Sequence, residues 1–306
     1  MITIEQLSSV VVEAAKLMTT DHFDITQKGG YADIVTSSDL AVQAFLCERL
    51  SVLLPGSGFL CEEVGMRDIN HEYLWIIDPI DGTANYSRGI DQCAICVALR
   101  HHADIVMGVV YVPRTGEMFT AQKGHGAFRN GKPIHVSDRP FANAVVCTAF
   151  SVYHKEYTDI CADIIVSLFR QCNDFRRFGA CAPELCYLAM GRCELYFEYM
   201  LGPWDFAAAS LVVRGWRNNL RPARSATLVL GTQGSDCCQQ CRKLPKTAGD
   251  SARAHEPHLH PPLQGERGVM ACEDKSLRAK MPFSLRTSPF ALCPSMQRCI
   301  PNEQFR

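Results

Sequence analysis

The stretch from Trp75 to Tyr86 constrains the fold most, because an apolar strand there ends in two carboxylates. Leu74 to Ile77 is typical of a buried strand, and Asp78 and Asp81 follow it, separated by a proline and an isoleucine. Burying unpaired carboxylates is costly unless cations compensate them, and Mg²⁺ suits carboxylate and carbonyl oxygens. The stretch therefore favours a metal site, although a capped turn after a strand is the alternative interpretation.

Gly82 and Thr83 come next and add a phosphate-binding feature. A glycine lets the backbone approach a ligand closely, and the amides at the start of a helix attract anions. The sequence therefore has a strand, an acidic pair, a Gly-Thr pair and the start of a helix in this order. This order predicts a site for a metal ion together with a phosphate group.

Two further stretches stand in a specific order around this one, Cys61-Glu62-Glu63 upstream and Gly202-Pro203-Trp204-Asp205 downstream. With the sequence Asp-Pro-Ile-Asp-Gly-Thr-Ala-Asn-Tyr between them, they resemble the signature of the inositol monophosphatase family, which includes fructose bisphosphatase. The resemblance implies an α/β fold, a layered αβαβα sandwich over residues 1–214. It also implies a Mg²⁺-dependent phosphatase acting on a small phosphorylated metabolite, with two or three ions, and a homodimer as in relatives.

The resemblance assigns roles by motif position. Glu62, Asp78 and the carbonyl of Ile80 would hold one ion, while Asp78, Asp81 and Asp205 would hold a second. Any third ion would be weaker, with Glu62 and water as ligands. Thr83, hydrogen-bonded to Asp39, would orient or deprotonate the attacking water, which the metals activate. The residues implied to bind substrate are Asp81, Gly82, Thr83, Gly179, Ala180, Cys181 and Glu198.

Several of these residues have a plainer alternative. Asp39 falls in the first turn of an expected helix, where carboxylates are usually caps or dipole partners. The turn around Gly179 is equally consistent with a strand-to-helix connection. No His near Cys181 would activate it as a nucleophile, so it is interpreted as core or pocket wall. Because neighbouring side chains on a strand alternate, Glu63 is expected to point outward or to support the site indirectly.

Hydrophobic periodicity and capping signals give the expected elements. Helices are expected at about 4–19, 38–54 (capped by Ser37 or Ser38), 154–171, 182–190 and 204–214. Strands are expected at 93–100, 104–113, 116–122, 144–150 and 195–199, with a hairpin at Asn130-Gly131. His101-His102 is interpreted as a solvated turn, because no partner ligands stand at a suitable spacing for a metal.

Composition places the chain among soluble cytoplasmic proteins. Apolar residues make up 47% and charged residues 21%, which is ordinary for a globular protein. The start of the chain lacks the basic region of a signal peptide, and no apolar run approaches the roughly 20 residues of a membrane span. Most cysteines before the tail stand in apolar runs, which predicts reduced core thiols.

Beyond residue 214 the sequence changes character. Residues 1–214 carry 17 basic and 25 acidic residues, whereas residues 215–306 carry 14 and 7. Apart from Ala226 to Leu230, this basic, Pro- and Cys-rich tail shows little periodicity and does not match the family pattern. A shifted reading frame, a disordered interaction tail and a zinc module are the three alternatives, the last one based on Cys237, Cys238, Cys241, His255, His258 and His260.

The tail leaves the function open in three ways. The first hypothesis is an inositol-phosphate phosphatase, for which Asp81→Asn is expected to abolish activity with little change in fold. The second is a relative that binds metal and phosphate without turnover, because the missing family elements would leave the second sheet with an unpaired edge and lower the solubility of the protein. The third is a related sugar-, histidinol- or nucleotide-phosphate phosphatase. Nucleic acid is not an expected partner, since stacking aromatics at regular spacing are lacking.

Overall fold

The computed structural model describes residues 2–18, 23–30, 33–63, 67–150, 152–215 and 227–232. The three alternatives for the tail, including the zinc module, concern residues that lie almost entirely outside this description.

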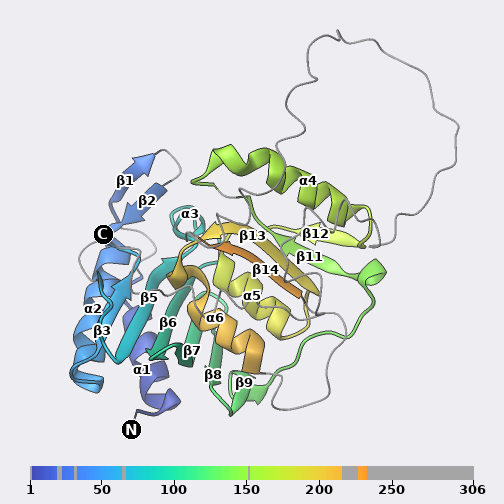
Figure 1. Ribbon diagram of the computed structural model, residues 1–306. Coiled ribbons are helices and arrows are strands. Elements are labelled where there is room, and N and C mark those ends of the chain that lie inside the picture. Colours follow the sequence, from blue (N-terminus) through green and yellow to red (C-terminus); the bar gives the residue numbers. More distant parts are fainter. Residues whose placement is uncertain are drawn as a thin grey trace, which may run out of the picture.

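Five layers make up the described fold, and they alternate helices with sheets (Figure 1). Helices α1 and α2 pack on one face of an eight-stranded sheet, and α5 and α6 pack on its other face. A four-stranded sheet follows, and α4 covers its outer side. The expected αβαβα sandwich is confirmed.

The helices have the following bounds: α1 Ile4–Ala15, α2 Ser37–Leu53, α3 Thr83–Tyr86, α4 Thr158–Phe169, α5 Cys181–Ala189 and α6 Pro203–Gly215, with short 3₁₀ turns at Phe141–Asn143 and Lys155–Tyr157. Strands β1 Ile25–Gly30 and β2 Asp33–Thr36 form a separate hairpin. The first sheet has the order β10-β9-β8-β7-β6-β5-β3-β4, with β3 Gly58–Cys61, β4 Arg67–Asp68, β5 Tyr73–Asp81, β6 Ala94–His101, β7 Asp104–Val112, β8 Glu117–Gln122, β9 Gly126–Arg129 and β10 Lys132–Pro133. The second sheet is parallel, in the order β12-β11-β13-β14, with β11 Val145–Thr148, β12 Asp174–Arg176, β13 Leu195–Leu201 and β14 Thr227–Thr232.

Strand β5 shows why its sequence is apolar without interruption. Leu74 and Ile76 belong to the core that includes α5 and α6, whereas Trp75 and Ile77 belong to the core that includes α1 and α2. Side chains alternate along a strand, so a strand covered by helices on both faces needs apolar residues at every position.

Most of the expected elements are confirmed, with shifts at their ends. Helix α1 has the expected capping box, in which Thr3 and Gln6 bond each other's backbone, but it ends at Ala15 rather than near residue 19. Helix α2 begins one residue earlier than expected. Its N-cap is Thr36, not Ser37 or Ser38, because Thr36 forms a capping box with Asp39 three residues later.

The turn and tail predictions can also be compared with the structure. The Asn130-Gly131 hairpin joins β9 to β10, and both residues have the positive φ of a tight two-residue turn. In the tail, β14 pairs in parallel with β13 and forms an edge of the second sheet, so the described residues extend this sheet by one strand beyond residue 214. The cysteines before residue 215 are free thiols, as expected. No helix in the described ranges has the length and hydropathy to cross a membrane.

Gly108 on β7 allows the central helix α6 to pack closely on the first sheet. A Cβ placed at this position would lie 2.7 Å from the backbone oxygen of Ala208 in α6. We therefore expect Gly108→Ala to lower the free energy of unfolding by about 1–3 kcal/mol, because helix and sheet must move apart. Urea unfolding measures this change, and Val52→Ala at a site that is 77% exposed serves as the control. Equal effects of the two substitutions would contradict the close packing.

Candidate active site

An irregularity at the end of β5 brings its two carboxylates to one side. Asp78 lies opposite Cys96 on β6 and Asp81 lies opposite Ala94. The paired positions are therefore three residues apart on β5 but two residues apart on β6, so β5 has one extra residue here. Side chains alternate along a regular strand, and residues three apart would point to opposite faces. The extra residue removes this alternation, and Pro79, which cannot donate to the ladder, suits such a bulge.

Asp81 also holds the N-terminus of α5. Its Oδ1 accepts the amide of Cys181 at 3.1 Å, and its Oδ2 accepts the amide of Ala182 at 2.6 Å. A carboxylate at this position satisfies amides that have no acceptor within the helix and interacts favourably with the helix dipole. Asp81 therefore joins the end of the first sheet to the middle helical layer.

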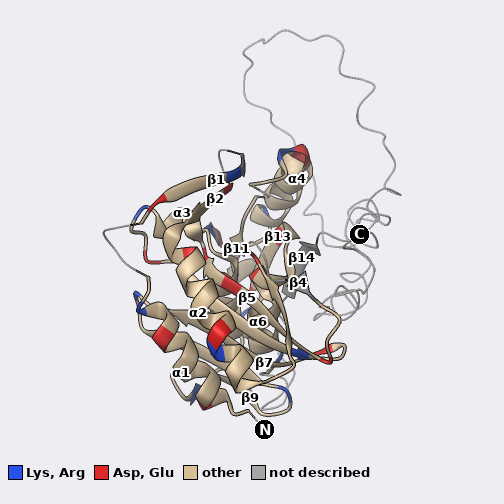
Figure 2. Cartoon of the chain, turned by 90° about the vertical axis from the view of Figure 1, so that its left-hand side faces the viewer, with Lys and Arg blue, Asp and Glu red and all other residues tan. Residues whose placement is uncertain are grey.

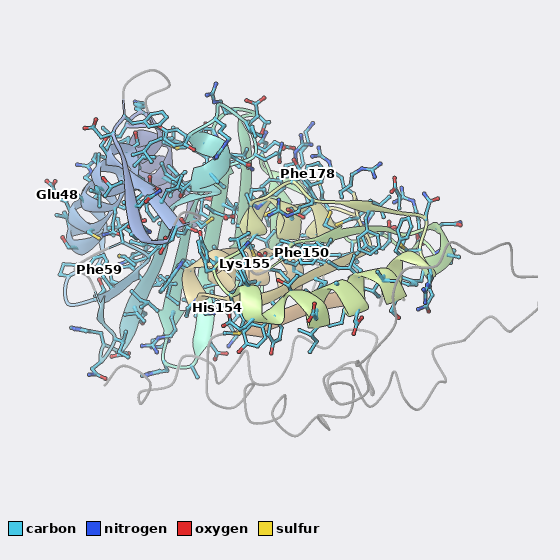
Figure 3. The ribbon with its side chains drawn as sticks, turned by 90° about the horizontal axis from the view of Figure 1, so that it is seen from above. Glu48, Phe59, Phe150, His154, Lys155 and Phe178 are labelled. Atoms are coloured by element: carbon cyan, nitrogen blue, oxygen red, sulfur yellow. The ribbon has the colours of Figure 1, made fainter. Side chains whose placement is uncertain are left out.

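The loop before α5 packs directly against Gly82. Gly82 has φ +85°, and a Cβ on it would lie 2.9 Å from Ala180, so this position requires glycine for two reasons. Asn85 in α3 then donates its side-chain amide to the carbonyl oxygen of Phe178 at 2.7 Å. Figure 3 labels Phe178 on this loop, which carries Gly179 and Ala180 to the side of Asp81.

Thr83 and Asp39 meet as the resemblance implies. Oγ1 of Thr83 lies 3.2 Å from Oδ1 of Asp39 and 3.0 Å from the carbonyl oxygen of Ile80. The other oxygen of Asp39 accepts the amide and hydroxyl hydrogens of Thr36. Asp39 is therefore both a helix cap and a partner of Thr83, and the two interpretations of this residue are compatible.

Glu62 is placed beside Asp78 by the parallel pairing of β3 with β5. Its amide donates to the carbonyl of Ile77 at 3.1 Å, one residue before Asp78. Lys28 on β1 lies 3.5 Å from a Glu62 oxygen and pairs more closely with Glu63. Glu63 is buried, so the predicted outward position is wrong, and indirect support of the site through Lys28 stays a prediction.

Asp205 and Glu198 approach the same region from the second half of the chain. Asp205 lies in the first turn of α6 and accepts the amide of Gly202 at 2.7 Å. Glu198 on β13 accepts the hydroxyl of Tyr196. Figure 2, with acidic residues in red, shows acidic segments gathered below the β1–β2 hairpin at the end of β5.

Burial and mutual repulsion raise the pKa values of this cluster. The pKa of Asp78 lies well above its ordinary range, because of burial first and then the charges of Glu62 and Asp81. Burial raises the pKa of Asp81 to about 7 and that of Asp205 well above its usual value. Within the described residues, Oδ1 of Asp78 is buried without a hydrogen-bond partner. An oxygen donor set with an orphaned carboxylate oxygen and excess negative charge fits hard divalent cations.

The Cys181 thiol does not behave as a nucleophile. Burial, followed by the nearby charges of Glu198 and Asp81, raises the pKa of Cys181 well above its ordinary value. The thiol therefore stays protonated, and the contribution of this residue to the site is its backbone amide.

Three residues escaped the sequence interpretation. Glu184 is buried in α5, and its Oε1 accepts the amides of Phe178 and Gly179 at 3.0 and 2.9 Å, which shapes the loop. Its place in the first turn of a helix gives no sign of this role. Lys28 gives a signal, because it is the one basic residue between Lys16 and Arg49 and directly precedes two glycines.

A third such residue, Tyr153, precedes α4. Its pKa is raised by burial of the hydroxyl and then by the charges of Glu62 and Asp33. The residue surface is 59% exposed. Figure 3 labels the next two residues, His154 and Lys155, where the chain turns into α4.

The raised pKa values predict that the metal-free protein loses stability as the pH rises. Folded Asp81 and Glu198 titrate at about 7 and Glu184 at about 8, against roughly 4 in an unfolded chain. Between these values the folded state binds more protons, so the free energy of unfolding falls as the pH increases. We expect the urea midpoint in chelator to decrease from pH 5 to 8 and Mg²⁺ to offset the decrease.

The variant Glu184→Gln isolates one contribution to this slope. The amide keeps an oxygen for the loop but does not ionise, so the decrease between pH 5 and 8 should be shallower. A midpoint that rises over this range in wild-type protein would contradict the assignment.

Comparison with known proteins shows the family of this chain. The family model described as the inositol monophosphatase family matches residues 2–237. Nus factor SuhB of Vibrio cholerae is 37% identical over 203 residues, which cover 66% of this chain and 76% of that protein. Inositol monophosphatase 3 of Solanum lycopersicum is 34% identical over 228 residues, which cover 69% of this chain and 84% of that protein.

A solved structure shows the same fold. The crystal structure of the extragenic suppressor protein SuhB from Bartonella henselae has a TM-score of 0.65 and 30% identity, and the match covers 69% of this chain and 84% of that one. The chain belongs to the inositol monophosphatase family.

Proposed function

We propose that this protein hydrolyses small phosphate monoesters with Mg²⁺ and that inositol monophosphate is its preferred substrate. The observation that carries the proposal is the convergence of four carboxylates from distant segments beside the Thr83–Asp39 pair. These carboxylates belong to Glu62, Asp78, Asp81 and Asp205, and the charges of the other three raise the pKa of Asp78. The identity with a plant protein named inositol monophosphatase 3 supports the substrate class.

The residues that would hold the ions are those of the acidic cluster. Glu62, Asp78 and the Ile80 carbonyl would hold one ion, and Asp78, Asp81 and Asp205 a second, with Asp78 shared. Bound Mg²⁺ would lower the pKa of water, neutralise phosphate charge and stabilise the leaving alkoxide.

The remaining chemistry belongs to the side chains and backbone around Thr83. A water that donates to the Thr83 hydroxyl would be held for attack, because that hydroxyl in turn donates to Asp39 Oδ1. Asp39 is buried, and burial raises its pKa, which favours acceptance of a proton relayed through Thr83. The amides of Gly82 and Thr83, at the start of α3, would bind phosphate oxygens.

The structure revises the expectation for Asp81→Asn. An asparagine offers one acceptor oxygen, so its NH₂ group would face one of the two α5 amides that Asp81 now satisfies. Loss of stability is therefore expected along with loss of activity. Asp205→Asn is the better test, because its one side-chain oxygen suffices for the amide of Gly202.

The decisive experiment measures phosphate release from inositol 1-phosphate by the full chain, with and without Mg²⁺. Wild-type protein should show metal-dependent release, and Asp205→Asn should lower it at least about 100-fold while the thermal midpoint stays close to that of wild type. Asp104→Asn, an exposed carboxylate paired with Lys123, is the matched control and should keep full activity. Equal turnover in all three proteins would refute the metal assignment.

Glu198 is the residue we propose to select the substrate. Its position beside Asp81, with burial raising its pKa to about 7, suits a hydrogen bond to a substrate hydroxyl. Glu198→Gln should raise KM for inositol 1-phosphate more than for a phenyl phosphate ester that lacks the hydroxyls. Equal losses on both substrates would show that Glu198 is structural. A panel with sugar, histidinol and nucleotide phosphates tests the alternative substrate classes in the same assay.

A second candidate is a protein that binds metal and phosphate without turnover. The observation that favours it is the family match, which ends at residue 237 of 306 and leaves the rest of the chain outside the family pattern. Phosphate binding in the presence of Mg²⁺, with no release from any ester of the panel, would support this candidate over the enzyme.

A further inference from the structure

We propose that Glu72, His101 and His102 form a second metal site, for a borderline divalent cation such as Zn²⁺. It lies at the opposite end of β5 from the acidic cluster. The sequence interpretation placed the two histidines in a solvated turn, because no ligand stood at a suitable spacing. The structure supplies that ligand, since Glu72 precedes His101 by 29 residues but lies against it.

The three side chains converge on one point. Nε2 of His101 lies 2.9 Å from Oε1 of Glu72, and Nε2 of His102 lies 3.7 Å from the same oxygen. One ligand atom from each residue lies within 4.8 Å of the other two. Bonds of about 2.0–2.1 Å to a tetrahedral Zn²⁺ place its ligand atoms roughly 3.3 Å apart. The two distances to Glu72 fall on either side of that value.

Backbone contacts hold this arrangement in place. Tyr73 pairs with His101 across the β5–β6 ladder, and the amide of His102 donates to the carbonyl of Glu72 at 3.0 Å. The His101 ring stacks on Tyr73 with centroids 4.3 Å apart and planes 9° from parallel. Because the backbone and one ring are already positioned, metal binding would cost little conformational entropy for ordering the ligands.

The ligand types decide which ion this site takes. Two imidazoles and one carboxylate suit Zn²⁺, Co²⁺, Ni²⁺ or Cu²⁺, whereas Mg²⁺ prefers oxygen ligands. The exposed side chains of Glu72 and His102 leave room for water at the remaining position. Six residues of extended chain separate Glu72 from Asp78, or about 20 Å, so one ion cannot serve both sites. In Figure 1, β5 runs up to α3, and the β6–β7 turn lies at the lower end.

A Zn²⁺ titration of the full chain against a fluorescent zinc chelator tests this proposal. Saturating Mg²⁺ is present throughout to occupy the acidic cluster. Glu72→Gln and His102→Asn should each lower the Zn²⁺ affinity at least about tenfold. Asparagine tolerates the left-handed backbone of His102, which has φ +51°, so the turn is preserved. Zn²⁺ should also raise the thermal midpoint of wild-type protein and not that of the variants.

His154→Asn is the matched control, because His154 also pairs with a glutamate, Glu156 at 3.0 Å, but does not belong to the proposed site. It should bind Zn²⁺ as wild type does. Equal Zn²⁺ affinity in wild type, Glu72→Gln and His102→Asn would overturn the proposal, and so would an equal loss in His154→Asn. Circular dichroism without Zn²⁺ checks that each variant is folded. If Glu72→Gln does not fold, the Zn²⁺ affinity of His102→Asn decides the question.

Discussion

The carboxylate of Asp81 is the interaction on which the rest of the structure depends. It ends strand β5 of the first sheet, lies within the acidic cluster and accepts two amides from α5. A negative charge buried among other negative charges is unfavourable, and the helix N-terminus offsets part of that cost. The same group thus positions the middle layer and helps to create the field that attracts cations.

The helix cap and the glycine turn near Asp81 each stabilise the backbone and shape the site. The capping box that starts α2 directs Asp39 toward Thr83, and the left-handed Gly82 that starts α3 allows Ala180 to approach. Helix caps and tight turns need particular residues for backbone reasons alone. In this fold those residues also shape the site, and their loss would damage stability and chemistry together.

The features of the fold that could be predicted from the sequence are those that depend on residues close together in the chain. The apolar run before Asp78 predicted a buried strand, and Asn130-Gly131 predicted its hairpin, because both depend on neighbours in the chain. The partner His101 of Glu72 lies 29 residues away in the chain, so no local spacing reveals it. Glu184 bonds the amides of Phe178 and Gly179 only six and five residues before it, but this contact depends on the shape of the loop, which the sequence pattern does not indicate. Glu63 was assigned by strand alternation, but β3 ends at Cys61, so the alternation no longer applies. The roles of the individual site residues remain proposals.

The contact between Asp81 and α5 joins residues 100 positions apart in the chain. Closing so long a loop costs entropy before any stabilising contact is gained, and proteins rich in such contacts fold slowly. The cation-attracting cluster is complete only when α5 has packed against the end of the first sheet. During synthesis, a ribosome-bound fragment that ends before α5 carries Asp81 without the two helix amides that partly compensate its charge.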